Sequence, residues 1–327
     1  MSLPPFGQPS LQLAFGDDVR PVDDWTDGEA AWRSYFDTVR REIADNLWPE
    51  YDPAKGEWVG AAAASHEEAA AAELALVVEH ILRPGVLQQR PAHAAGDGVH
   101  PVPDHLWHYR VEDYARDLIS ADEHEQRVAR HPIGSIYSYD PSIELESLGR
   151  IFSTMYRKYG SLYELKRFFL RPRPQLAAFL LGVEGFSWQQ AHSGVHTGNH
   201  PALISGHCAQ GLLLTCVMME EAMEEGEVRP SRARALKQYA VDFGDRRVFG
   251  GVHYITDNIA SWAAVLRLIP HVFPGNGAFL QSFIRSAIVD QSLCYRIASD
   301  HFGEHEALEP ALAYLRSRVD GDPDPSV

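Results

Sequence analysis

Along most of the chain, apolar residues recur at three- and four-residue steps, which is the pattern of helices that bury one face. The clearest stretch covers residues 29–47, and an alanine-rich stretch at residues 61–82 continues the helical pattern. Further helices are predicted at residues 104–130, 141–159, 161–170, 206–225, 231–248, 252–269 and 278–301. No long alternation of apolar and polar residues lies between hairpin turns, so no strand is expected. The pattern predicts an all-α fold.

Proline and glycine indicate where these elements end. Residues 1–28 are rich in Pro, Gly and Asp and show no helical period, so we interpret them as an irregular lead-in. Pro172 and Pro174 should stop the helix at residues 161–170 and begin a loop, because proline donates no N–H and disfavours helix in the residue before it. We expect three parts, of which the first packs on the second: the lead-in with the N-terminal helices at residues 1–135, a core helical bundle at 136–319 and a polar tail at 320–327.

The net charge and the cysteines restrict the partners and the compartment. The chain has 327 residues and a formal net charge of -16, so it repels nucleic acid phosphates and anionic membrane surfaces. Three cysteines are an odd number, and Cys208 and Cys216 lie in one apolar helical stretch, which fits free thiols in a reducing compartment. The first residues lack the pattern of a signal peptide, and no apolar stretch reaches the roughly 18 residues of a spanning helix. We therefore expect a cytoplasmic protein that binds neither nucleic acid nor membrane, while a homo-oligomer stays open.

The first candidate site feature is a pair of cations, Lys166 and Arg173, against this acidic background. They are seven residues apart, which on a helix is two turns and one face, so both side chains would point at one spot. Two cations that converge in this way suit an anion. The alternative is an amphipathic surface face whose charges are solvated.

The second feature is the sequence Ser205-Gly206-His207 at the start of an apolar helix. A helix start exposes unpaired N–H groups and the positive end of the helix dipole, and glycine lets an oxyanion approach the backbone closely. His207 in the first turn would then serve as a general acid or base at that anion. The alternative is that Ser205 is a plain N-cap and His207 a partly buried side chain.

The third feature combines Arg247, His253 and Asp257 around a break at Gly250-Gly251. His253 and Asp257 are four residues apart, which on a helix brings the carboxylate to the imidazole. Such a carboxylate fixes the imidazole tautomer and raises its basicity, as a nucleophile or metal ligand needs. The glycine pair reorients the chain so that Arg247 also points inward. Alone, each of the three features is weak.

In order and spacing, the three features resemble the signature Lys-x6-Arg-Pro, Ser-Gly-His and Arg-x5-His-x3-Asp of the type 2 phosphatidic acid phosphatase and vanadium-dependent haloperoxidase superfamily. The resemblance runs from Lys166 to Asp257, and every charged or catalytic position of the signature is filled. Two positions depart from the pattern: Ile204 stands where the family usually has proline, and Arg246 where it usually has serine. The resemblance implies a helical bundle core of the acid phosphatase and haloperoxidase type, with additional N-terminal helices.

The resemblance also implies a role for each matched residue. Those that bind the oxygens of phosphate or vanadate are Lys166, Arg173, Ser205, Gly206 and Arg247. His253 would be the one protein ligand of vanadium, or would attack phosphorus and form a phosphohistidine. His207 would handle the proton on the opposite side, and Asp257 would orient His253. Vanadate resembles the phosphoryl-transfer transition state, so one pocket serves both chemistries.

Residues outside the signature favour halide oxidation. The stretch from His200 to Gln210 is similar to that of algal bromoperoxidases, in which a histidine seven residues before the catalytic one is followed by proline. His200, near vanadate, would tune halide binding or proton delivery. We expect a vanadium-dependent haloperoxidase that uses vanadate as cofactor and oxidises halide, bromide foremost, with hydrogen peroxide.

Two alternatives stay open. A soluble phosphatase of the same superfamily would hydrolyse a phosphate monoester through a phosphohistidine at His253 and would need no cofactor. The length of 327 residues favours it, since haloperoxidases with this pattern are usually longer. A non-catalytic relative would bind phosphate or vanadate without turnover, and it is disfavoured because no ligand of the signature is missing.

Overall fold

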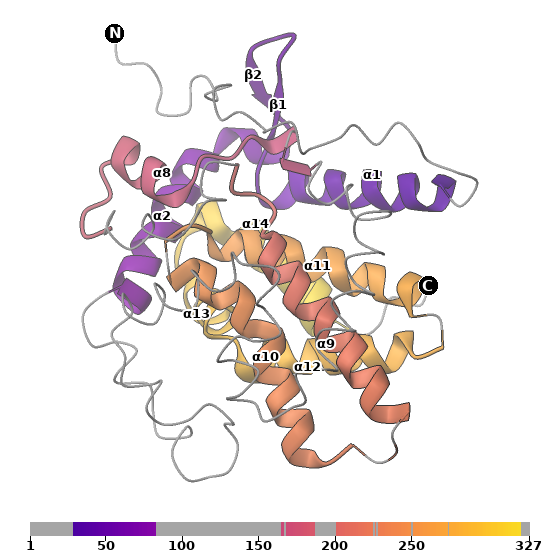
Figure 1. Ribbon diagram of the computed structural model, residues 1–327. Coiled ribbons are helices and arrows are strands. Elements are labelled where there is room, and N and C mark those ends of the chain that lie inside the picture. Colours follow the sequence, from indigo (N-terminus) through magenta and orange to yellow (C-terminus); the bar gives the residue numbers. More distant parts are fainter. Residues whose placement is uncertain are drawn as a thin grey trace, which may run out of the picture.

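The computed structural model describes residues 29–82, 165–186 and 201–321, apart from residues 167, 225, 227, 250 and 274. This part of the chain is mostly helical, which confirms the predicted all-α class (Figure 1). The irregular lead-in and the helices expected at residues 104–130 and 141–159 lie outside the described residues. Within the described ranges, no helix is long and apolar enough to cross a membrane.

Long helices form the core of the molecule: α9 (Gly206–Glu224), α10 (Pro230–Phe249), α11 (Ile255–Val272) and α12 (Gly277–Gln291). α9 and α10 run antiparallel side by side in the lower half of Figure 1. α11 is the central helix, because every residue from Ile255 to Leu266 is buried. The helices predicted at residues 206–225, 231–248 and 252–269 are confirmed to within three residues at each end.

Two glycines let α9, α10 and α11 approach one another closely. A Cβ atom on Gly211 of α9 would lie 2.8 Å from the Phe243 Cβ of α10. A Cβ atom on Gly244 of α10 would lie 2.7 Å from the Cys208 Sγ of α9 and 3.1 Å from the Asn258 Nδ2 of α11. A larger residue fits at neither position without displacing its neighbours. This packing brings the first turns of α9 and α11 together, where two of the candidate site features lie.

The N-terminal segment packs on this core. Its elements are α1 (Glu29–Asn46), the strands β1 (Glu50–Asp52) and β2 (Glu57–Val59), the 3-10 turn η1 (Ala61–Ala64), α2 (His66–Val77) and the π-helical turn η2 (Val78–Leu82). α1 lies across the upper part of Figure 1. Its Tyr35 hydroxyl donates to the Ala264 carbonyl of α11 at 2.7 Å. Its Glu42 carboxylate accepts from Arg267 of α11 at 2.6 Å, so α1 is joined to the central helix.

The β1–β2 hairpin contradicts the expectation that the chain contains no strand. Its two strands are three residues each and pair antiparallel, which is too short for an apolar alternation to show in the sequence. Gly56, at φ 71°, lies in the turn, where glycine adopts the left-handed region without strain. Trp58 packs edge-on against Trp48 and Tyr51, so aromatic contacts stabilise the pair.

Serine interrupts two of the predicted helices. Within residues 61–82, Ser65 separates η1 from α2, so the stretch is helical but is not one helix. Within residues 278–301, Ser292 separates α12 from α13 (Leu293–His301). The Ser292 hydroxyl accepts the Tyr295 N–H at 3.0 Å and donates to Asp245 of α10 at 2.8 Å, so it starts a new helix. The elements that follow α13 are η7 (Phe302–Glu304), η8 (Glu306–Leu308), α14 (Glu309–Leu315) and the π-helical η9 (Arg316–Asp320).

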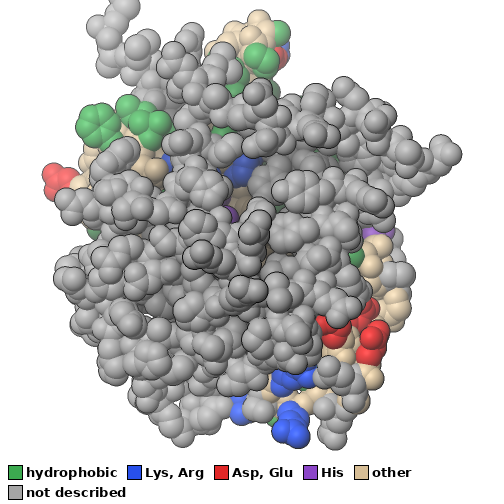
Figure 2. All heavy atoms as spheres, in the orientation of Figure 1, with side chains coloured by type: hydrophobic (Ala, Val, Ile, Leu, Met, Phe, Trp, Pro, Cys, Tyr) green, Lys and Arg blue, Asp and Glu red, His purple; other side chains and the backbone are tan. Residues whose placement is uncertain are grey.

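The loop expected after Pro174 is a helix instead. Pro174 is the first residue of α8 (Pro174–Leu181), where its missing N–H is not needed, and Gly182 ends the helix at φ 68°. Lys166 lies in the helical turn that precedes this region, whereas Arg173 is the extended residue before α8. The two cations therefore do not share one helix face, contrary to the expectation. α8 also exposes apolar side chains, which gather at the upper left of Figure 2.

Candidate functional site

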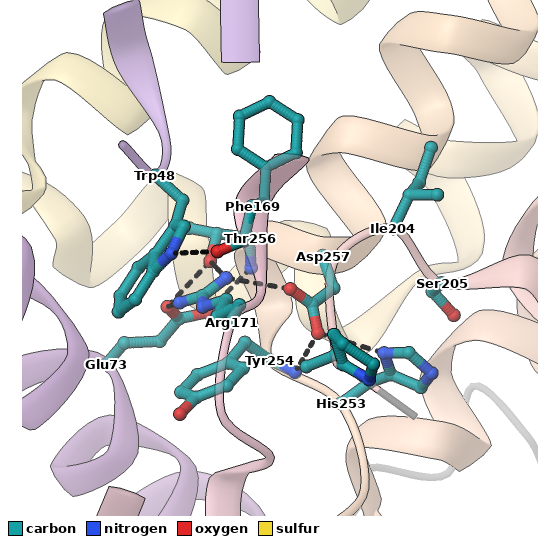
Figure 3. Close-up of polar contacts among 12 residues, drawn as sticks. Trp48, Glu73, Phe169, Arg171, Ile204, Ser205, His253, Tyr254, Thr256 and Asp257 are labelled. Carbon is teal, nitrogen blue, oxygen red and sulfur yellow. Dashed lines mark hydrogen bonds and ion pairs between the residues drawn. The ribbon is translucent and has the colours of Figure 1, made fainter. Parts of the chain in front are cut away.

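His253 lies at the centre of the candidate site, between Asp257 and Arg173. Its Nδ1 is 2.9 Å from the Asp257 Oδ2 (Figure 3), and its Nε2 is 2.9 Å from the Arg173 Nη1. A carboxylate accepts hydrogen bonds and a guanidinium donates them. The His253 ring therefore carries its proton on Nδ1, and Nε2 offers its lone pair.

The backbone before α11 positions this pair. His253 lies two residues before the first residue of α11, and not on the helix as expected, yet its side chain reaches Asp257 in the first turn. Asp257 also accepts the Tyr254 N–H at 3.1 Å, which satisfies a donor at the helix start. The His253 N–H bonds to the Arg247 carbonyl at 3.2 Å and closes the turn after α10. Gly251, at φ 68°, makes that turn possible.

Burial and charge keep His253 neutral. Burial and the neighbouring Arg173 hold the pKa of His253 well below its ordinary value, and Asp257 opposes this shift only in part. Burial alone would raise the pKa of Asp257, but Arg171 and His253 lower it to about 2. The site thus presents a neutral imidazole backed by an ionised carboxylate.

Lys166 holds the segment that leads into α9. Its Nζ atom donates at 2.6 to 3.0 Å to three carbonyl oxygens, those of Pro201, Ala202 and Ile204. Three accepting carbonyls need three N–H donors, so the geometry fits the ammonium form. Burial lowers the pKa of Lys166, the charges of Arg173 and Arg247 lower it further, and Asp257 opposes the shift. The resemblance implies that Lys166 binds an oxyanion directly, whereas here its three donors are engaged with the backbone.

The start of α9 contributes Ser205, Gly206 and His207. The buried Ser205 hydroxyl accepts the Cys208 N–H at 3.4 Å in the manner of an N-cap. The Ser205 carbonyl accepts from the Ser261 hydroxyl at 2.9 Å, which ties the start of α9 to the second turn of α11. Gly206 is the first residue of the helix, and the His207 side chain in the first turn is half-buried.

The cations of the site are close enough to repel one another. Beyond the effect of burial, Arg173 and Arg247 lower the pKa of Lys166, and Arg173 and Lys166 lower that of His253. Arg247 is fully buried in the last turn of α10. Gathering like charges away from water is unfavourable, and a bound anion relieves it. A positive cluster beside a neutral imidazole is therefore suited to an oxyanion.

The sequence gives no local pattern for two further residues of the site, Arg171 and Glu73. The Arg171 guanidinium donates to Asp257 at 2.7 Å and to Glu73 of α2 at 3.1 Å, and all three side chains are buried. Glu73 and Arg171 are 98 residues apart in the sequence, so no spacing links them. The available signal is that two further arginines, Arg167 and Arg171, lie between the matched cations Lys166 and Arg173.

The structure thus brings together Lys166, Arg173, Arg247, His253 and Asp257, and it places Ser205 on the side of His253 away from Arg171 (Figure 3). His200 lies outside the described residues. Within the described ranges, no group of three or more His, Cys, Asp or Glu side chains is placed to hold a metal ion. Comparisons with protein-family models, with curated proteins and with solved structures find no match for this chain.

Proposed function

We propose that the cluster around His253 is an oxyanion site and that the chain is a vanadate-dependent haloperoxidase-like enzyme. It would oxidise halide, bromide foremost, with hydrogen peroxide. The observation that carries the proposal is the state of His253: Nδ1–H is bonded to Asp257, and the Nε2 lone pair faces the cations. A neutral imidazole nitrogen is the form that binds a metal or attacks an electrophile.

The residues present fit vanadate. Nε2 of His253 is a nitrogen donor of the kind that transition metals accept from proteins. Arg173 and Arg247 are buried cations that compensate the charge of the vanadate oxygens, and the Gly206 N–H stands at a helix start. Lys166 contributes charge and fixes the segment before α9. Bound vanadate supplies a Lewis-acid centre at which hydrogen peroxide is activated toward halide.

The protein's own groups then have defined tasks. Asp257 keeps the proton on Nδ1, so that Nε2 is the atom turned toward the ligand. Arg173 has to transfer its Nη1 donor from Nε2 to an oxygen of the anion. His207 at the α9 start supplies the proton that the overall reaction consumes, in which peroxide, bromide and a proton give hypobromous acid and water.

Phosphate monoester hydrolysis is the second candidate, and the same Nε2 lone pair favours it. His253 Nε2 would form a bond to phosphorus while the ester P–O bond breaks, and His207 would give its proton to the leaving alcohol. Water, deprotonated by His207, would then cleave the P–N bond and release phosphate. In this reaction the phosphate ester is the substrate and no cofactor is needed.

One paired assay tests both candidates. The purified protein is incubated with orthovanadate and assayed for bromination of an activated diketone with peroxide and bromide; the untreated protein is assayed for hydrolysis of an aryl phosphate. We expect vanadate-dependent bromination, which His253→Ala abolishes. His271→Ala is the matched control, because His271 is an exposed histidine in the last turn of α11.

The outcomes separate the candidates. Hydrolysis without vanadate, inhibited when vanadate is added, would establish the phosphatase instead. Phosphate binding in a calorimeter with neither activity would indicate the non-catalytic relative. If the folded protein shows no activity and binds neither phosphate nor vanadate, the oxyanion site itself is wrong.

A further inference from the structure

Arg171 is a buried arginine that the proposed chemistry does not use, and it fixes one side of Asp257. The Asp257 Oδ1 accepts from Arg171 Nη1 at 2.7 Å, while Oδ2 accepts from His253 Nδ1 at 2.9 Å. Each carboxylate oxygen therefore has its own partner. Rotation of the carboxylate would break both bonds, so Arg171 holds Oδ2 against the imidazole.

A second carboxylate holds Arg171 in turn. The Arg171 Nη2 donates to the Glu73 Oε2 at 3.1 Å, and the Arg171 Nη1 also donates to the Thr256 hydroxyl at 2.7 Å. The Thr256 hydroxyl donates in turn to the Glu73 Oε2 at 2.7 Å, which closes a ring of hydrogen bonds among three side chains (Figure 3). Glu73 Oε1 accepts the Thr256 N–H at 2.6 Å, at the positive end of α11.

Aromatic side chains fix the plane of the guanidinium. The Arg171 Cζ lies 3.6 Å from the ring centroid of Tyr254 and 4.6 Å from that of Trp48. The Trp48 indole N–H donates to the Phe169 carbonyl at 3.1 Å, two residues before Arg171. A planar fork stacked on rings suits arginine, because Nη1 reaches Asp257 while Nη2 reaches Glu73, whereas lysine has a single terminal nitrogen and no planar group to stack.

We propose that Arg171 is a positioning residue that acts through Asp257 to hold the Nδ1 proton of His253, and that Glu73 of the N-terminal helix α2 completes this arrangement. The N-terminal segment is then a component of the site. The effect on anion binding rests on the proposed function, whereas the placement of the His253 proton does not. A merely structural ion pair would contribute to stability and leave the His253 ring unchanged.

Nuclear magnetic resonance of the full chain, with ¹⁵N-labelled histidine and no added anion, tests the proposal. We expect wild-type His253 to show a protected Nδ1–H proton and an unprotonated Nε2. In Arg171→Lys this proton should be lost, or should exchange with water at least about tenfold faster, because the bond opens locally more often. Arg40→Lys is the matched control, since Arg40 forms a two-bond pair with Glu50 outside the site.

A second pair of variants covers the case in which Arg171→Lys does not fold. Thr256→Val removes the hydroxyl that joins Arg171 to Glu73, and Thr256→Ser keeps it. The Nδ1–H signal should weaken in the valine variant and persist in the serine variant. An unchanged signal in a folded Arg171→Lys protein, or in folded Thr256→Val when Arg171→Lys fails to fold, would overturn the proposal.

Anion binding separates this inference from the proposed function. Phosphate and vanadate affinity, measured by calorimetry, should fall roughly 10- to 100-fold in Arg171→Lys, as for loss of an outer partner of a ligating histidine. If the wild-type protein binds neither anion while the His253 signal still depends on Arg171, the proposed function fails and the positioning role stands.

Discussion

At the residue scale, the central side chain of the candidate site is His253, which burial and the neighbouring cations keep neutral. His253 has its Nδ1 proton on Asp257 and its Nε2 against Arg173, so both ring nitrogens have partners of opposite kind. If Nε2 were protonated, it and the Arg173 Nη1 would both be donors, and no hydrogen bond could form between them. The folded protein therefore resists a proton that the unfolded chain accepts.

This difference predicts a pH dependence of stability. The folded pKa of His253 is held well below the unfolded value of about 6.5, so its contribution to stability is complete above that pH and is lost as the pH falls below it. Between pH 7.5 and 5, urea unfolding should show a free energy that falls by up to about 1.4 kcal/mol per pH unit. His253→Gln should flatten this slope, and His271→Gln should retain it. An equally steep slope in His253→Gln would contradict the prediction.

Sequence patterns reveal residue pairs that are close along the chain, and little else at this scale. The contact of His253 with Asp257 follows from a spacing of four, even though His253 precedes the helix. Lys166 and Arg173 do lie in one cluster, but a turn and the start of α8 bring them there, so the helical argument for them was wrong. Glu73 had no local signal, because its partner is 98 residues away.

At the element scale, the close approach of α9 and α10 depends on the absence of side chains at Gly211 and Gly244. Alanine is the better helix former by about 1 kcal/mol, so Gly211→Ala would stabilise the protein if space were available. Instead the added Cβ would lie 2.8 Å from the Phe243 Cβ and 3.1 Å from the Ala240 carbonyl. Because of this clash, Gly211→Ala should destabilise the protein.

We therefore expect Gly211→Ala to lower the free energy of unfolding by about 1–3 kcal/mol, the usual range for overpacking. Gly275→Ala is the control, because a Cβ there would meet nothing within 4 Å. Chemical denaturation of the two variants beside wild type makes the comparison. Equal stability of the two variants would show that α9 and α10 can move apart at little cost.

Helix positions could be predicted from apolar periodicity, but helix boundaries could not always be. The long helices bury a continuous face, and this gives α9, α10 and α11 a strong pattern. Ser292 interrupts such a pattern without changing it, because its hydroxyl is satisfied by Asp245, 47 residues away. A proline can end one helix or begin the next, and its place in the sequence alone does not say which; Pro174 begins α8.

At the scale of the whole molecule, Glu42 of α1 joins the two ends of the described chain. Its Oε1 accepts from Arg267 of α11 and Arg318 of η9, both at 2.6 Å, and its Oε2 accepts from the Tyr314 hydroxyl at 3.0 Å. These contacts connect the first described helix, the central helix and the last turn. They favour cooperative unfolding of the N-terminal segment with the core.

Glu42→Gln should lower the free energy of unfolding by about 1–2 kcal/mol, the discounted value for hydrogen bonds of a partly exposed charged group. Tryptophan fluorescence and far-ultraviolet circular dichroism should report one coincident transition in wild type. Glu50→Gln, whose partner Arg40 is only 10 residues away, should cost less. Two separate transitions in wild type would mean that the N-terminal segment is an independent unit.

The three carbonyl oxygens bonded to Lys166 have a consequence for how the proposed oxyanion would bind. The Lys166 ammonium is surrounded by the carbonyl oxygens of Pro201, Ala202 and Ile204, much as a cation is surrounded by the oxygens of a crown ether, and all of these groups belong to the chain itself. The approach to α9 is therefore shaped during folding, and binding does not have to order it. Under the proposed function, an oxyanion would therefore meet a segment that Lys166 already holds in place.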